Sequence, residues 1–115
     1  MSRGDDFILN SYRIVWLFVF FDLPVKTAKN RKDAVRFRAN LESDGFRMMQ
    51  YSVYIRFCGS RENADVHIKR IRSFVPSPGM VSILSVTDKQ YSNMVNVWGM
   101  AERRLPGTPK QLELF

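Results

Sequence analysis

The chain has 115 residues, a length that suits one domain, because two halves would each be too short to bury a hydrophobic core. Hydrophobic residues make up 45% of it and charged residues 25%, which are ordinary values for a folded soluble protein. Lys and Arg number 18 against 11 Asp and Glu, so the net charge is +7. This excess favours a polyanionic partner, nucleic acid before an anionic membrane. The alternative is a basic protein that is merely soluble.

Several classes of protein are excluded by what the chain lacks. A single cysteine, Cys58, rules out an internal disulfide and a cysteine-based zinc site, and its strand-like surroundings predict a buried small side chain. The longest apolar run, residues 14–21, is far shorter than a membrane span. Two aspartates near the N-terminus and the lack of a small-residue cleavage site argue against a signal peptide. We therefore expect a cytoplasmic protein that does not enter a membrane.

Hydrophobic patterning predicts a buried strand and then a helix in the first part of the chain. Residues 1–11 are polar and are expected to be flexible. Residues 12–21 are aromatic and β-branched without polar alternation, which is typical of a strand in the middle of a sheet, and a following proline ends it. Residues 27–43 predict a helix that an Asp-Gly pair stops.

The second part of the chain predicts further strands and one more helix. Residues 46–57 alternate between apolar and polar side chains but are long for one strand, so we expect a bulge or break near Gln50 and Tyr51. A second helix ends near Phe74, and a strand follows over residues 80–86.

The C-terminal part predicts a short capped helical turn through Ser92 and a last short strand over residues 94–98. This order of elements over residues 12–99 favours an α+β, ferredoxin-like sandwich, in which two helices cover one face of an antiparallel sheet. The other face would expose large apolar side chains, which monomers rarely tolerate. We therefore expect a homodimer that buries this face and uses the last strand to pair across subunits. Residues 100–115 form a charged, loop-like tail.

Asp22 is the one carboxylate that stands out by its position, at the end of the first strand. Considered alone, it favours a structural role, an Asx turn onto its own backbone. The alternative is a Mg²⁺ ligand, because Mg²⁺ takes one or two carboxylates, several waters and phosphate oxygens. In a homodimer a second Asp22 could reach the same ion, which could then activate a water against a phosphodiester. The only histidine, His67, is interpreted as a packing residue on the second helix.

The first predicted helix is strongly cationic. Such a face is often only solvated surface, but the basic excess of the whole chain favours contacts to nucleic-acid phosphates without readout of bases. The candidate residues are Lys26, Lys29, Arg31, Lys32, Arg36 and Arg38.

Four motifs in this order and spacing resemble the CRISPR-associated protein 2 family: Phe-Phe-Asp-Leu-Pro at 20–24, Glu-Ser-Asp-Gly-Phe at 42–46, Gln-Tyr-Ser-Val-Tyr at 50–54 and Val-Thr-Asp-Lys-Gln-Tyr at 86–91. The last resembles the branch that accompanies single-effector (type II) systems. The resemblance implies a ferredoxin-like obligate homodimer that sits between two dimers of the integrase subunit, CRISPR-associated protein 1. There it would hold the duplex part of a prespacer DNA during spacer acquisition. The resemblance also implies, as an alternative, a Mg²⁺-dependent endoribonuclease or endonuclease in which Asp22 holds the metal, with single-stranded RNA as a candidate substrate.

The end of the tail matches the Gln-Leu-x-Leu-Phe pattern by which many bacterial proteins dock in the pocket of the sliding clamp. A clamp tether would suit spacer integration, which leaves gaps for a polymerase to fill. The favoured alternative is that these side chains add to a sheet edge or dock on the integrase subunit. The candidate partner-binding residues are Gln111, Leu112, Leu114 and Phe115.

Overall fold

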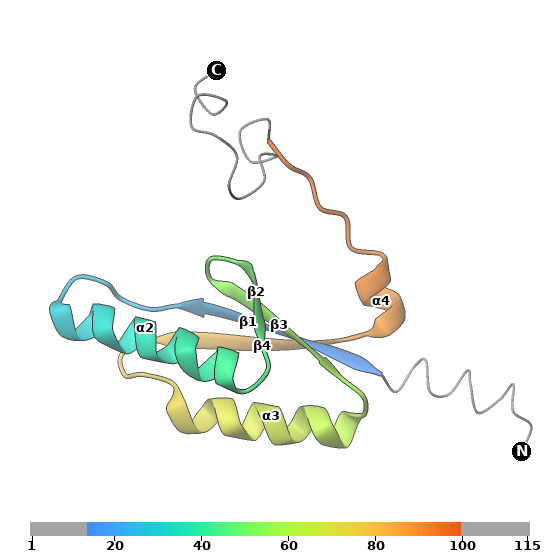
Figure 1. Cartoon of the computed structure of the whole chain (residues 1–115), viewed down its shortest axis with the longest axis horizontal. Coiled ribbons are helices and arrows are strands. Elements are labelled where there is room, and N and C mark those ends of the chain that lie inside the picture. The colour runs from blue at the N-terminus through green and yellow to red at the C-terminus, as the bar shows by residue number, and fades with distance from the viewer. Residues whose placement is uncertain (1–13, 100–115) are drawn as a thin grey trace, which may run out of the picture.

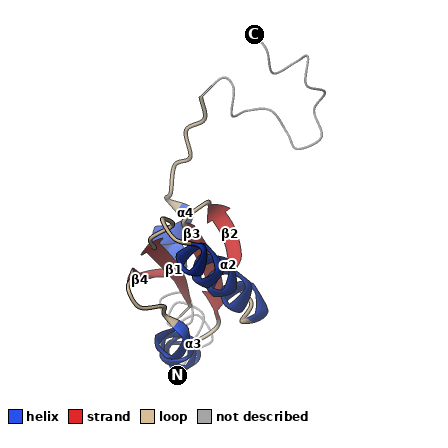
Figure 2. Cartoon of the chain, turned by 90° about the vertical axis from the view of Figure 1, so that its left-hand side faces the viewer, coloured by secondary structure: helices blue, strands red, loops and turns tan. Residues whose placement is uncertain are grey.

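A computed structural model describes residues 14–99 of the chain. The elements follow the order β1 (Val15–Asp22), α2 (Ala28–Ser43), β2 (Arg47–Gln50), β3 (Val53–Cys58), α3 (Arg61–Phe74), β4 (Met80–Thr87) and α4 (Asp88–Ser92). The four strands form one antiparallel sheet in the order β2-β3-β1-β4, and α2 and α3 cover the same face of it (Figures 1 and 2). The expected ferredoxin-like α+β fold is confirmed, with β1 as an inner strand.

The core lies between the sheet and the two long helices. In β1 every second side chain points towards the helices, as the twofold repeat of a strand requires. These side chains pack against the apolar stripe of α2, which consists of Ala34, Phe37 and Leu41, and against the buried face of α3. Cys58 is fully buried in this core, as its surroundings in the sequence predict. The core residues from β1 are Val15, Leu17, Val19 and Phe21.

The opposite, helix-free face of the sheet, which we call the outer face, is covered at one end only. There α4 packs on β1: the rings of Trp16 and Tyr91 stack with centroids 3.9 Å apart, and Trp16 Nε1 donates a hydrogen bond to Asp88 Oδ1 at 2.8 Å. The other end of the outer face is bare. It exposes Phe20 (39%), Leu84 (51%) and Met80 (68%), so the expected apolar patch is present there.

The expected break in residues 46–57 is a turn at Tyr51 and Ser52 that divides the segment into β2 and β3. The short helical turn α4 is also confirmed, and its N-cap is Thr87, whose Oγ1 accepts a hydrogen bond from Gln90 N at 3.1 Å. Within residues 14–99, no helix is long and apolar enough to cross a membrane.

The expected last strand over residues 94–98 is wrong for the single chain. Residues 94–99 form no strand, and the side chains of Val95 and Val97 are almost fully exposed. A strand exists only when its backbone groups pair with a neighbouring strand. Met49 and Gln50 of β2 line a depression together with residues 95–98, but the sheet of residues 14–99 ends at β2 on that side and includes no ladder to this segment. The β-branched residues in this segment therefore indicate a capacity for pairing that the isolated chain does not use.

Candidate metal and nucleic-acid sites

Asp22 is the last residue of β1 and lies on the outer face, because it alternates with the core residue Phe21. Its partner in β4 is Met80, and both residues line a shallow depression of about 320 Å³ together with Ser52 and Ser82. The Asp22 side chain is exposed and forms no hydrogen bond with another residue of the described range. The Asx turn that its position favours is therefore not formed among residues 14–99, and the carboxylate is available to a ligand.

The donor types around Asp22 fit Mg²⁺ in part. Mg²⁺ binds hard oxygen ligands, and the depression offers one carboxylate with the hydroxyls of Ser52 and Ser82 along its wall. Between residues 14 and 99 there is no group of three or more His, Cys, Asp or Glu side chains that could hold a metal ion. One chain thus offers an incomplete site, which a second Asp22 or the phosphate oxygens of a substrate would have to complete.

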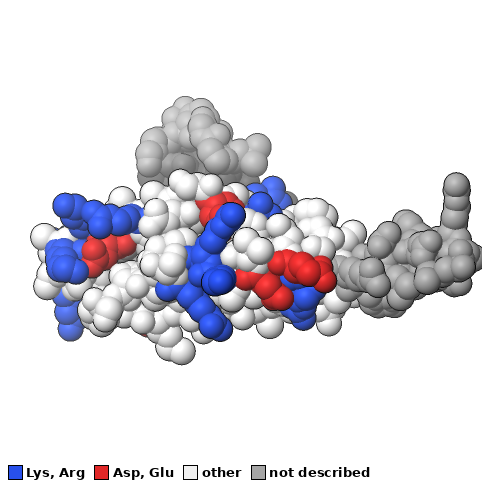
Figure 3. Space-filling model, turned by 90° about the horizontal axis from the view of Figure 1, so that it is seen from below, with Lys and Arg blue, Asp and Glu red and all other residues white. Residues whose placement is uncertain are grey.

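The six candidate phosphate-binding residues lie on α2 or just before it. Thr27 begins the helix with a capping box: its Oγ1 accepts a hydrogen bond from Asn30 N at 3.0 Å, and Asn30 Oδ1 accepts one from Thr27 N at 3.3 Å. Because the apolar stripe of α2 faces the sheet, the cationic side chains lie on the surface of this helix that points away from the sheet. Seen from the helix side, Lys and Arg side chains gather where α2 begins and α3 ends (Figure 3).

Three of the six cations are held by other parts of the chain. Lys29 Nζ pairs with Asp33 Oδ2 at 2.8 Å, and Arg31 donates to the carbonyl groups of Val25 and Lys26, both at 3.1 Å. The guanidinium of Arg38 lies over the ring of Tyr51. The other three are exposed and make no hydrogen bond or ion pair with another described residue, so they have charge to offer to a phosphate. These are Lys26, Lys32 and Arg36.

The structure does not bring Asp22 and the cationic helix together in one site. Asp22 lies on the outer face of the sheet, whereas α2 covers the opposite face. Arg38 reaches the end of β1 from the helix side, where its guanidinium carbon lies 5.3 Å from the ring centroid of the core residue Phe21. The candidate metal ligand and the candidate phosphate-binding residues of α2 thus belong to opposite faces of the sheet.

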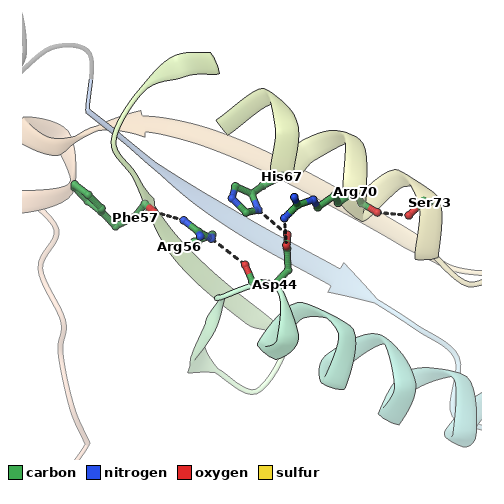
Figure 4. A network of polar contacts seen from close by, with 6 residues as sticks. All are labelled: Asp44, Arg56, Phe57, His67, Arg70 and Ser73. Atoms are coloured by element: carbon green, nitrogen blue, oxygen red, sulfur yellow. Dashed lines mark hydrogen bonds and ion pairs between the residues drawn. The ribbon is translucent and has the colours of Figure 1, made fainter. Parts of the chain in front are cut away.

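A partly buried polar network, which the sequence does not predict, joins the end of α2 to α3 and β3 (Figure 4). Asp44 Oδ2 lies 2.7 Å from His67 Nδ1, and Asp44 Oδ1 accepts a hydrogen bond from Arg70 at 2.8 Å. The backbone oxygen of Asp44 accepts a hydrogen bond from Arg56 Nε at 2.9 Å. His67 is thereby confirmed as a buried residue of the second helix, and its partners give it a structural role.

The charges in this network lower the pKa of the Asp44 carboxylate. Burial alone would raise the pKa of Asp44, but the hydrogen bonds and charges of His67 and Arg70 outweigh it and hold this pKa below its usual value of 3.8. The ionised carboxylate is therefore the form that the folded chain favours.

The predicted docking segment at the end of the tail lies outside the described range, so its role stays a prediction from the sequence. Its residues are Gln111, Leu112, Leu114 and Phe115.

The fold and the exposed carboxylate at the end of an inner strand define a small α+β protein of the ferredoxin-like class. The family model described as CRISPR associated protein Cas2 matches residues 15–94. The chain belongs to this family, which confirms the resemblance seen in its motifs.

Relatives and solved structures agree with this assignment. The protein called CRISPR-associated endoribonuclease Cas2 in Flavobacterium psychrophilum is 50% identical over 107 residues, 93% of each chain. Its namesake in Parvibaculum lavamentivorans is 46% identical over 101 residues, covering 88% of this chain and 100% of the relative. A crystal structure of a Cas2 protein has a TM-score of 0.57 at 17% identity, covering 80% of this chain and 94% of that one. Streptococcus pyogenes Cas2 gives 0.54 at 22% identity, covering 73% and 99%. These two structures support the fold alone.

Proposed function

We propose that the protein is a homodimeric nucleic-acid-binding scaffold of CRISPR adaptation. It would join dimers of the integrase subunit, CRISPR-associated protein 1, and hold prespacer DNA while a spacer is integrated. The observation that carries the proposal is the cationic surface of α2, on which Lys32 and Arg36 are exposed and have no partner in the described chain. Side chains of this kind bind phosphates regardless of base sequence, which is what a holder of many different prespacers requires.

The bare end of the outer face supports the proposed homodimer. Phe20 and Leu84 are half-exposed there on adjacent inner and edge strands, and a second copy would remove them from water. The unpaired segment 94–99 supports the same arrangement, since its backbone could add to the sheet of the other subunit. Asp22 lies at the edge of this bare end, so a twofold axis passing there would bring two carboxylates together.

A second candidate function is a Mg²⁺-dependent endoribonuclease or endonuclease, which the names of the relatives favour. Asp22 would hold the ion through its carboxylate, and Ser52 and Ser82 could bind water or a phosphate oxygen beside it. A bound Mg²⁺ would supply a polarised phosphate and a water of lowered pKa for attack on the phosphodiester. This candidate places the reaction on the outer face, away from the cations of α2, with single-stranded RNA as a candidate substrate.

Charge reversal on α2 tests the scaffold proposal. The affinity of the full chain for a blunt DNA duplex is measured over a range of salt concentrations, with the wild type and with Lys32→Glu/Arg36→Glu. If each residue neutralises one phosphate, the double variant binds more weakly and the slope of log affinity against log salt falls by about two.

The matched control is Arg61→Glu/Lys69→Glu on α3, which changes the net charge by the same amount on another helix. Equal losses in both pairs would mean that only the overall charge matters. An unchanged slope in the α2 variant would remove this helix from the interface.

A further inference from the structure

The turn between β2 and β3 exposes an aromatic ring beside the end of β1. Tyr51 is 70% exposed, although it is a large side chain next to a packed sheet. The following residue, Ser52, accepts a backbone hydrogen bond from Phe21 at 3.2 Å and lines the depression that contains Asp22. The ring therefore belongs to the same end of the sheet as the candidate metal ligand.

Arg38 holds this ring in place from the helix side. Its guanidinium carbon lies 4.1 Å from the centroid of the Tyr51 ring, and its Nε donates a hydrogen bond to the Tyr51 carbonyl group at 3.5 Å. Arg38 thus contacts both the side chain and the backbone of Tyr51. An exposed ring that is already restrained loses little further conformational freedom when a ligand stacks on it.

We propose that Tyr51 is a stacking platform for an unpaired base of a single-stranded nucleic acid, DNA or RNA. Arg38 occupies one side of the ring, so the exposed area of Tyr51 is its other face and edge. A base can stack there, and Arg38 places a positive charge near the phosphate that follows it. This inference rests on the proposed nucleic-acid binding and adds a specificity to it: a continuous duplex keeps its base faces covered, whereas an unpaired strand does not.

The first test uses the wild-type protein and a short single strand that carries the fluorescent base 2-aminopurine, made once as DNA and once as RNA. Stacking on Tyr51 quenches the fluorescence of this base on binding, and the strand that is quenched more strongly identifies the preferred nucleic acid. Binding without quenching in either strand would overturn the proposal before any variant is made.

The second test compares Tyr51→Phe with Tyr51→Ala. Phe keeps the ring and should bind the single strand as the wild type does, whereas Ala should raise Kd by about 5- to 140-fold, the loss expected for one base–aromatic stack. Affinity for a blunt duplex should be unchanged in both variants. Val35→Ala, which truncates an exposed apolar side chain on α2, serves as the matched control and should leave both affinities unchanged.

Arg38→Lys tests the support of the ring, because lysine keeps the charge but cannot stack as a planar group. It should weaken single-strand binding in the wild-type background and add little to Tyr51→Ala, since the two residues act as a unit. Additive losses would contradict this coupling.

The outcomes separate this inference from the proposed function. If the blunt duplex binds but Tyr51→Ala does not weaken single-strand binding, the platform is overturned and the scaffold stands. If neither nucleic acid binds the wild type, the proposed function itself fails. If Tyr51→Ala changes the oligomeric state measured by sedimentation, the ring belongs to a subunit interface and the proposal is wrong.

Discussion

The network around Asp44 gives a prediction whose size can be worked out from the structure. Asp44→Ala removes two contacts that contribute unequally to the free energy of unfolding. The contact with His67 is buried, with 4% and 10% of the two side chains exposed, and a hydrogen bond to a charged group in such a place contributes about 1.5–3 kcal/mol. The contact with Arg70 contributes less, about 0.2–1 kcal/mol, because 59% of the Arg70 side chain is exposed and water screens the pair.

The expected loss in the free energy of unfolding is therefore about 2–4 kcal/mol, measured by urea denaturation. Asp33→Ala is the matched control, because it removes the single ion pair with Lys29 on the surface of α2. That change should stay within about 0.5 kcal/mol, since exposed helical pairs contribute little and alanine favours a helix. Equal losses in the two variants would refute the claim that burial gives the Asp44 contacts their strength.

The same contacts predict how the difference in the free energy of unfolding between wild type and Asp44→Ala depends on pH. The pKa of Asp44 is lower in the folded chain than its usual 3.8, so folding favours the ionised form. The stability from this carboxylate is complete above the unfolded pKa and is lost as pH falls through the lower folded pKa. The gap between the two proteins should therefore narrow only below about pH 4. A gap that narrows between neutral pH and pH 5 would contradict this assignment.

Three further predictions concern single residues. Gly45→Ala should destabilise the fold by about 1–3 kcal/mol in the same denaturation assay. Residue 45 has φ +87°, and an alanine Cβ there would lie 2.9 Å from Arg56 Nε. A variant as stable as the wild type would contradict this prediction. Burial raises the pKa of the Cys58 thiol, so a thiol reagent should label it only after denaturation, and rapid labelling of the native chain would show that the core opens. Leu84→Asp should shift the proposed dimer towards monomer in sedimentation, whereas Val66→Asp on α3 should not.

The elements that the sequence predicts correctly are those with local signals. The strand at 15–22 follows from an apolar run that a proline ends, and the helix at 28–43 from its apolar stripe and the Asp-Gly pair that stops it. The outer position of Asp22 follows from strand alternation with Phe21 once the core face is known.

The remaining features depend on partners that lie far away in the chain or outside it. Asp44 contacts His67 and Arg70, which lie 23 and 26 residues further along the chain, and the local sequence does not predict these contacts. The segment 94–98 has the composition of a strand, but pairing requires a neighbouring strand, and none of the strands between residues 14 and 99 pairs with it. The separation of Asp22 from the cations of α2 is likewise a property of the layered fold, because sequence distance alone places them close together.

Integration of a labelled prespacer by the purified integrase subunit tests the central claim most directly. The subunit is assayed alone, with the wild-type protein and with Asp22→Ala, after sedimentation has shown that both proteins form the same oligomer. A scaffold predicts little integration by the subunit alone and equal integration with wild type and variant, since Asp22 lies apart from the cationic surface of α2. Loss of integration with an Asp22→Ala protein that still binds the subunit and the DNA would contradict this account and favour a metal-dependent role for the carboxylate.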